Sequence, residues 1–320
     1  MPKLNMVQAI NLALKEEMER DGSVIVMGED VGRDGGVFRV TEGLLEKFGT
    51  ERVMDTPLSE SGIVGTAIGM AAYGLRPVAE IQFMGFIYPA LDQIFSHAAR
   101  LRSRSRGRYT CPLVVRTPYG AGIRAPEIHS ESTEALFCHM PGIKVVVPST
   151  PSTAKGLLKS AIRDPDPVVF LESTRVYRQI KEDVTDEEYT IPLGKARIAK
   201  EGKEVTLVAW GSMLHRCLKA AEGMDAEVID LMTLSPFDEE TLYRSARKTG
   251  RVVVVHEAPK TCGVGAEISA SLAEEAMLYL KAPIMRVTGY DAVIPLPKLE
   301  DYYMPDVNRI KRSIDEVMKY

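Results

Sequence analysis

Asp55-Thr-Pro-Leu-Ser-Glu-Ser-Gly-Ile-Val-Gly-Thr-Ala-Ile-Gly-Met-Ala-Ala-Tyr-Gly74 is the stretch that decides the fold. It predicts a helix that begins after Ser59, because a serine side chain can accept a hydrogen bond from the free amides of a first turn. A glycine inside a helix costs about 0.5–1 kcal/mol relative to alanine. Since Gly62, Gly65 and Gly69 share this helix, we expect it to pack closely against another backbone or helix.

Glu60, in the first turn of that helix, has two interpretations. Close packing would shield the carboxyl group from water, which favours its protonated form and suits it to proton exchange. The alternative is a solvated carboxylate that only complements the helix dipole in an ordinary capping sequence. The neighbouring residues leave both interpretations open.

The chain around this helix predicts an α/β fold. Asn5 caps a first helix that ends near residue 21, and further helices are expected at 91–101 and 152–162. Short apolar runs predict strands at 24–27, 77–82, 112–117, 143–148 and 167–171. Because these runs are continuously apolar, they indicate a parallel sheet covered by helices on both faces.

A polar, acidic segment at 176–192 predicts a boundary between two domains, as the length of 320 residues also suggests. We place one domain at 1–185, a linker at 186–200 and a second domain at 201–320. The second alternation predicts strands at 205–209, 226–231, 251–256 and 283–287. Its helices are expected at 213–222, 238–248 and 266–279, with a last one from Asn308.

Composition excludes several classes of protein. With 40 basic and 44 acidic residues, the chain has no general attraction for nucleic acid or an anionic membrane. It has no signal-peptide pattern and no apolar run near the roughly 18 residues that span a bilayer, so we expect a cytoplasmic protein. Its four cysteines lie far apart, which argues against disulfides and structural zinc and favours reduced thiols.

Five arginines alternate with small or apolar residues from Arg100 to Arg108. Such a run is either a solvated helix end or a surface that docks a partner chain. No aromatic residue lies between the arginines, which disfavours stacking on nucleic acid.

His129 lies in a glycine-rich loop after an expected strand, where open α/β sheets bind ligands. A loop histidine either transfers protons or is structural. Phe83, Phe86 and Tyr88 follow another strand and form either an aromatic wall or part of the core. Glu60, Phe86 and His129 come from three consecutive strand-to-helix connections. We therefore expect one crevice to hold all three side chains.

The order of motifs resembles the beta subunit of the thiamine-dependent 2-oxo acid dehydrogenase (decarboxylating) family. The resemblance spans essentially the whole chain and rests on Met27-Gly-Glu-Asp-Val-Gly32, residues 55–62, Gly74-Leu-Arg-Pro-Val-Ala-Glu80, His129-Ser130, Pro141-Gly-Ile-Lys-Val-Val-Val-Pro148 and Ala154-Lys-Gly-Leu-Leu158. It implies a thiamine-diphosphate-binding, transketolase-like pyrimidine domain followed by a transketolase C-terminal-type α/β domain.

The resemblance also implies roles for individual residues. Glu60 is expected to hydrogen-bond the pyrimidine ring of thiamine diphosphate and so help activate the cofactor. Phe86 is expected to stack on that ring, with Leu58 and Gln82 beside it. His129 matches the active-site histidine of the family, which acts in lipoyl acylation or in stabilising intermediates.

Partners follow from the same resemblance. The chain has no Gly-Asp-Gly motif and three asparagines, so we expect an alpha subunit to hold the diphosphate and Mg²⁺. Two alpha and two beta chains form a heterotetramer that passes the acyl unit to the lipoyl group of a dihydrolipoyl acyltransferase core. A K⁺ site is expected at Leu113, Ala161, Ile162, Asp164 and Asp166, where Asp166 replaces the common asparagine.

Two other functions remain open at this point. One is half of a split transketolase-like or sugar-phosphate synthase, which would use sugar substrates and no lipoyl partner. The other is a non-catalytic scaffold subunit. Within the leading hypothesis the substrate is a branched-chain 2-oxo acid or pyruvate, and Gln82 favours a branched-chain or broad bacterial or archaeal type.

Overall fold

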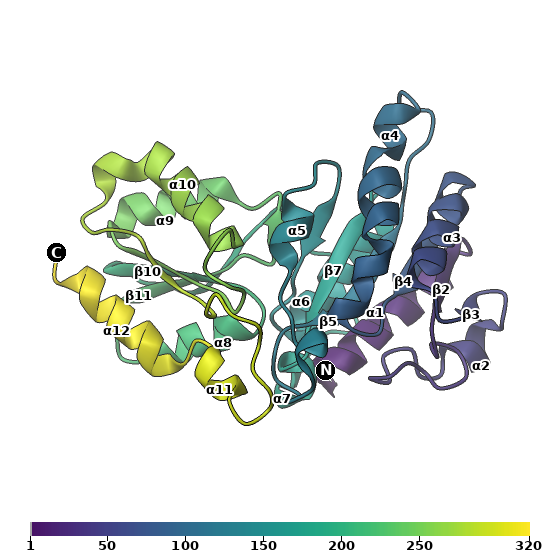
Figure 1. Ribbon diagram of the computed structural model, residues 1–320, viewed down its shortest axis with the longest axis horizontal. Helices are drawn as coiled ribbons and strands as arrows, with labels where there is room; N and C mark the ends of the chain where they lie inside the picture. Colours follow the sequence, from purple (N-terminus) through teal and green to yellow (C-terminus); the bar gives the residue numbers. More distant parts are fainter. Residues whose placement is uncertain (1) are drawn as a thin grey trace.

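The computed structural model describes residues 2–320, which fold as two α/β halves side by side (Figure 1). The first half contains a seven-stranded sheet with the order β12-β6-β7-β5-β4-β2-β3. All neighbouring strands in it are parallel except β12, which runs antiparallel to β6. The strands are β2 (Val24–Gly28), β3 (Val53–Asp55), β4 (Arg76–Glu80), β5 (Val114–Tyr119), β6 (Lys144–Val146), β7 (Val168–Ser173) and β12 (Thr233–Ser235).

Helices cover both faces of this sheet, as its continuously apolar strands require. On β2, Val24 and Val26 point into a core with α1 (Met6–Arg20) and α6 (Pro151–Arg163), whereas Met27 points to the opposite core with α3 (Glu60–Ala72). Shorter elements are α2 (Leu44–Phe48), α5 (Glu134–Cys138), α7 (Val176–Gln179) and the antiparallel pair β1 (Lys3–Leu4) and β8 (Glu182–Asp183).

The second half contains a five-stranded sheet with the order β14-β13-β10-β11-β9. Its strands are β9 (Arg197–Lys200), β10 (Val205–Ala209), β11 (Ala226–Asp230), β13 (Val252–Val255) and β14 (Met285–Val287). One face carries α9 (Glu239–Thr249) and α10 (Val264–Ala276), and the other carries α8 (Ser212–Ala220) and α12 (Val307–Met318) (Figure 1). The short α11 (Glu300–Tyr303) precedes α12.

The two halves share one hydrophobic core, and the second half contributes an edge strand to the sheet of the first. Strand β12 follows β11 in the chain but pairs with β6 of the first sheet. A single cluster of buried apolar side chains runs from Ile63 on α3 through Trp210 to Ile268 on α10. The predicted domain boundaries at 185 and 201 remain a prediction. Strand β12 lies in the range assigned to the second domain, but it pairs with the sheet of the first.

The expected α/β class is confirmed, and several local expectations are too. Asn5 caps α1 in a capping box with Gln8, and the Ser59 side chain accepts from the amide of Gly62 at the head of α3. The helix expected at 91–101 is present as a continuous run of helical turns, but it is not a regular α-helix. A 3₁₀ segment that contains Pro89 (Met84–Ala90) leads into it, and a π-type segment (Gln93–His97), a second 3₁₀ turn (Ala98–Arg100) and the short α4 (Leu101–Arg104) follow.

The glycine stripe of α3 (Gly62, Gly65 and Gly69) is not packed against another backbone among the described residues, so the close packing expected for it remains a prediction. An added Cβ at Gly65 would meet only the Gln93 side chain, at 3.2 Å, and one at Gly69 would meet nothing within 4 Å among the described residues. The side chains of Leu58 and Tyr73, before and after this helix, are 80% and 93% exposed. The stripe is therefore an open face of the chain.

A buried ion network joins three neighbouring strands of the first sheet. Arg116 on β5 donates to Glu80 on β4 and, at 2.8 and 2.7 Å, to Glu172 on β7. Tyr177 donates to the same Glu172 carboxylate at 2.5 Å. Because all four side chains are buried, each carboxylate depends on its protein donors for the hydrogen bonds that water would otherwise supply.

We expect Arg116→Met to destabilise the chain by about 3–5 kcal/mol, since it leaves two buried carboxylates without their cation. Arg102→Met is the matched control: Arg102 pairs with Asp166 at 2.6 Å on the surface, and an exposed pair contributes about 0–1 kcal/mol. Urea unfolding of both variants measures the difference. Equal losses of stability would contradict a structural role for the network.

Candidate active site

The candidate site lies where β2, β3, β4 and β5 end. The four strands are neighbours in the first sheet and run parallel, so the segments that follow them meet at one edge. These segments carry Glu29, Glu60, Phe86 and His129. The connections expected to form one crevice therefore leave the same edge of the sheet.

Glu60 is buried at the first turn of α3, next to an acidic residue that the sequence reasoning missed. Glu29 directly follows β2 and is also buried. Burial, together with the nearby charges of Glu60 and Asp30, raises the pKa of Glu29. The signal was available, because Glu29 lies in the quoted motif at residues 27–32 and follows a buried strand, but only the fold brings it to Glu60.

His129 lies against two aromatic rings. Its imidazole centroid is 4.2 Å from that of Phe83 and 5.1 Å from that of Phe86, both edge to face. Its Nδ1 is buried and has no hydrogen-bond partner among residues 2–320. A buried ring nitrogen without a partner is costly, and this one remains available to a bound molecule.

Gly85 explains how the aromatic residues reach His129. A Cβ at residue 85 would lie 2.1 Å from Ile128 Cγ1 and 2.3 Å from the Ile128 carbonyl oxygen. The 3₁₀ segment after β4 can therefore touch the short 3₁₀ turn Glu127–His129 only because residue 85 lacks a side chain. This close approach places Phe83 and Phe86 beside the imidazole.

The remaining predicted cofactor residues lie at the rim. Gln82 Nε2 donates to Asp30 Oδ2 at 2.8 Å, and the Leu58 side chain is exposed. A mostly apolar groove of about 340 Å³ runs beside the head of α3 and is lined by Met27, Met54, Asp55, Thr56, Pro57, Ser59, Gly62, Ile63, Thr66 and Met70. Gly62 is the one glycine of the stripe that lines this groove.

The residues predicted for K⁺ lie in and beside one turn after α6. The carbonyl oxygens of Ile162 and Asp164 accept from Arg76 Nη1 at 2.8 and 3.3 Å. The Asp164 carboxylate accepts from Lys144, and that of Asp166 from Arg102. Since these cations already engage the oxygens, a K⁺ ion would have to share them, and the site remains a prediction.

Comparison with known proteins matches both halves of the chain. Residues 2–179 match the pyrimidine binding domain of transketolase, and residues 194–310 match the transketolase C-terminal domain. The chain is 51% identical to the pyruvate dehydrogenase E1 component subunit beta of Acholeplasma laidlawii, over 99% of this chain and 98% of that protein. It belongs to the family of 2-oxo acid dehydrogenase E1 beta subunits.

Other members and solved structures extend the comparison. The pyruvate dehydrogenase E1 component subunit beta and the 2-oxoisovalerate dehydrogenase subunit beta of Bacillus subtilis are each 48% identical to this chain, with full coverage on both sides. A split gene transketolase, solved as an inactive beta4 tetramer, has a TM-score of 0.81 at 23% identity and covers 99% of each chain. The last likeness shows the fold alone.

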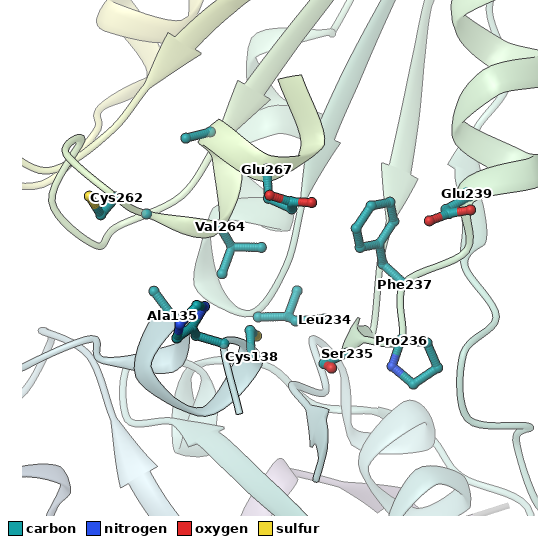
Figure 2. Close-up of a pocket in the computed structure, with 13 residues that line it drawn as sticks. Ala135, Cys138, Leu234, Ser235, Pro236, Phe237, Glu239, Cys262, Val264 and Glu267 are labelled. Atoms are coloured by element: carbon teal, nitrogen blue, oxygen red, sulfur yellow. The ribbon is translucent and has the colours of Figure 1, made fainter. Parts of the chain in front are cut away.

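This member of the E1 beta family also contains a larger cavity, of about 630 Å³, between its halves (Figure 2). It is lined by α5, by the segment from Leu234 to Phe237, and by the first turns of α9 and α10. None of the predicted site residues lines it. This cavity is therefore separate from the candidate site at the edge of the first sheet.

Two further buried carboxyl groups escaped the sequence reasoning. Glu134 begins α5 in the first half, and Glu257 follows β13 in the second half. Burial raises the pKa of each to about 7, and the neighbouring Glu134 adds to the effect on Glu257, whereas Ser212, Arg175 and the Ala121 amide oppose it. No composition or spacing signal marks this pair, because it forms only where the two halves meet.

We expect Gly85→Ala to destabilise the chain by about 1–3 kcal/mol, because the new methyl group collides with Ile128. Gly69→Ala is the control, since it lies in α3 with open space around it. That change should stabilise the isolated chain by about 0.5–1 kcal/mol through helix propensity. Urea unfolding measures both, and a harmless Gly85→Ala would contradict the close approach.

The raised pKa values of Glu134 and Glu257 predict a pH-dependent stability. Each folded-state pKa lies near 7 against a reference of 4.5, so the native state binds more protons between these values and loses stability as the pH rises through this range. The loss is on the order of 3 kcal/mol for each fully buried carboxyl group.

Glu134→Gln should therefore gain stability relative to the wild type between pH 5 and pH 8, as followed by urea unfolding at each pH. Glu51→Gln, at an exposed position, is the control. A stability difference between Glu134→Gln and wild type that does not change with pH would rule out a proton held by this pair.

Proposed function

We propose that this chain is the beta subunit of the decarboxylating component of a 2-oxo acid dehydrogenase complex. With an alpha subunit it catalyses the thiamine-diphosphate-dependent oxidative decarboxylation of a 2-oxo acid and the reductive acylation of a lipoyl group on the acyltransferase. The observation that carries the proposal is the buried Glu60 at the head of α3, at the same sheet edge as Phe86 and His129. The full-length similarity to E1 beta subunits supports it.

The residues at this edge suit the pyrimidine half of thiamine diphosphate. The Glu60 carboxyl group can hydrogen-bond a ring nitrogen, and Phe86 offers a half-buried aromatic ring for stacking, with Leu58 and Gln82 beside it. When bound, the cofactor would supply a nucleophilic carbon that adds to the 2-oxo group. It would also accept the electron pair left behind when carbon dioxide departs. Glu60 would exchange a proton with the pyrimidine ring in this activation.

His129 serves the later acyl-transfer step. Its buried Nδ1 lacks a partner among the described residues, and an imidazole can donate a proton near neutral pH. The rings of Phe83 and Phe86 restrict its motion and exclude water from one side. We therefore assign His129 to the proton transfer that accompanies acylation of the lipoyl sulfur.

The face of the chain beside the site is exposed. Leu58 and the glycine stripe are exposed, and a helix with small residues can pack closely against another chain. We propose that an alpha subunit covers this face and brings the diphosphate and Mg²⁺ sites, in a heterotetramer of two alpha and two beta chains. None of the helices described for residues 2–320 is long and apolar enough to cross a membrane, and we propose a cytoplasmic location.

The substrate is a branched-chain 2-oxo acid or pyruvate. The two Bacillus subtilis relatives named for these substrates are both 48% identical to this chain, and the pyruvate dehydrogenase subunit of Acholeplasma laidlawii is 51% identical. These values are too close to choose between the two acids. Half of a split transketolase is the second candidate, since such a protein shares this fold. Turnover of a 2-oxo acid, with no turnover of a sugar phosphate, separates the two.

We expect Glu60→Gln to lower 2-oxo acid decarboxylation by at least about 10²-fold when this chain is paired with its alpha subunit, because the amide cannot exchange the required proton. Glu46→Gln is the control, since Glu46 also lies in the first turn of a helix but is exposed. Size-exclusion chromatography checks that both variants assemble. Unchanged turnover in Glu60→Gln would favour a scaffold role for the chain.

A further inference from the structure

The segment that carries His129 belongs to the first half of the molecule, but both of its ends contact the second half. It runs from Gly120, after β5, to Glu134, at the start of α5. Both β5 and α5 belong to the first half. Thr174, after β7 of the first half, donates to the Gly120 carbonyl oxygen at 2.9 Å. Each end is also bound by a group from the second half, in the loops after β10 and β13 of the second sheet.

Glu257 binds the first end. Its Oε2 accepts from the Ala121 amide at 3.1 Å, and Ser212 donates to its Oε1 at 3.1 Å. A Cβ at Gly120 would lie 2.6 Å from the same Oε2, so the carboxyl group rests directly on the backbone of residue 120. Glu257 is buried, and Ala121 would have no water to replace this acceptor.

Trp210 binds the second end. Its Nε1 donates to Glu134 Oε1 at 3.3 Å. The indole is buried and stacks on His256 with 5.3 Å between ring centroids and 13° between planes. The stack fixes the direction of the N–H group, because the ring cannot turn without losing it.

Between these ends, few polar contacts hold the imidazole itself. The His129 ring has no hydrogen bond to Nδ1 within residues 2–320, and its described contacts are the rings of Phe83 and Phe86. The Arg124–Asp301 pair, at 3.0 Å, links the middle of the segment to α11 but is more than half exposed. Exposed pairs of this kind contribute little.

We infer that Glu257 and Trp210 are positioning residues, which hold the two ends of segment 120–134 and so fix His129 against Phe83 and Phe86. The second half of the chain thereby sets the geometry of a site that lies in the first half. The inference about the segment rests on these contacts alone, and its consequence for catalysis rests on the proposed role of His129.

Hydrogen–deuterium exchange of the full chain tests the inference. In Glu257→Ala, the amides of residues 120–134 should exchange about tenfold faster than in the wild type, since a buried amide loses its acceptor. Glu257→Gln keeps an acceptor oxygen and should restore slow exchange. Asp301→Asn, which removes only the exposed pair, should leave exchange unchanged.

Trp210→Phe is the second variant, because it keeps an aromatic ring beside His256 while it removes the N–H group together with part of the buried indole. It should speed exchange at residues 130–134 and leave β10 and β13 protected. Unchanged exchange of segment 120–134 in both Glu257→Ala and Trp210→Phe would overturn the inference, and so would equal exchange in Glu257→Ala and Glu257→Gln.

Kinetics separate this inference from the proposed function. If His129 acts in acyl transfer, Glu257→Ala should lower kcat for lipoyl acylation more than it changes KM for the 2-oxo acid, and His129→Ala should do the same. If exchange rises in Glu257→Ala but neither variant alters acylation, the proposed role of His129 fails and the positioning of the segment stands.

Discussion

The guanidinium group of Arg116 is the constraint on which the candidate site depends. It links β4, β5 and β7 through Glu80 and Glu172, at the edge of the sheet where the site forms. The strand ends cannot shift relative to one another without separating a buried cation from its carboxylates, which would be costly. The segments that carry Phe86 and His129 leave two of these strands, so their separation is set by the same network.

The two halves contribute differently to the proposed site. The first half supplies the side chains at the sheet edge, whereas the second half supplies β12 at the sheet's far edge and the groups that bind segment 120–134. The continuous apolar core from α3 to α10 couples the halves. A change in the packing of the second half would therefore reach His129 through Glu257 and Trp210.

Much of the fold could be predicted from the sequence, because its signals are local. Continuous apolar runs identified the parallel strands, and Ser59 marked the head of α3. The crevice was predicted from the order of strand-to-helix connections, which places Phe86 and His129 together at the sheet edge. The family resemblance named the site residues, and their roles remain proposals.

What could not be predicted depends on contacts between distant segments. Strand β12 is three residues long and exists only because β6 offers an edge. Glu29 and Glu257 look like ordinary polar residues after strands until the fold buries them. The helix at 91–101 was predicted, but its π-type and 3₁₀ turns were not, because an apolar period does not distinguish one helix type from another.

We propose that this chain holds half of a cofactor site. The most direct test is to measure thiamine diphosphate and Mg²⁺ binding, together with decarboxylation of pyruvate and of a branched-chain 2-oxo acid, for the chain alone and after co-expression with its alpha subunit. Binding and turnover are expected only in the pair. Cofactor binding and turnover by the chain alone would show that the site is not divided between two subunits.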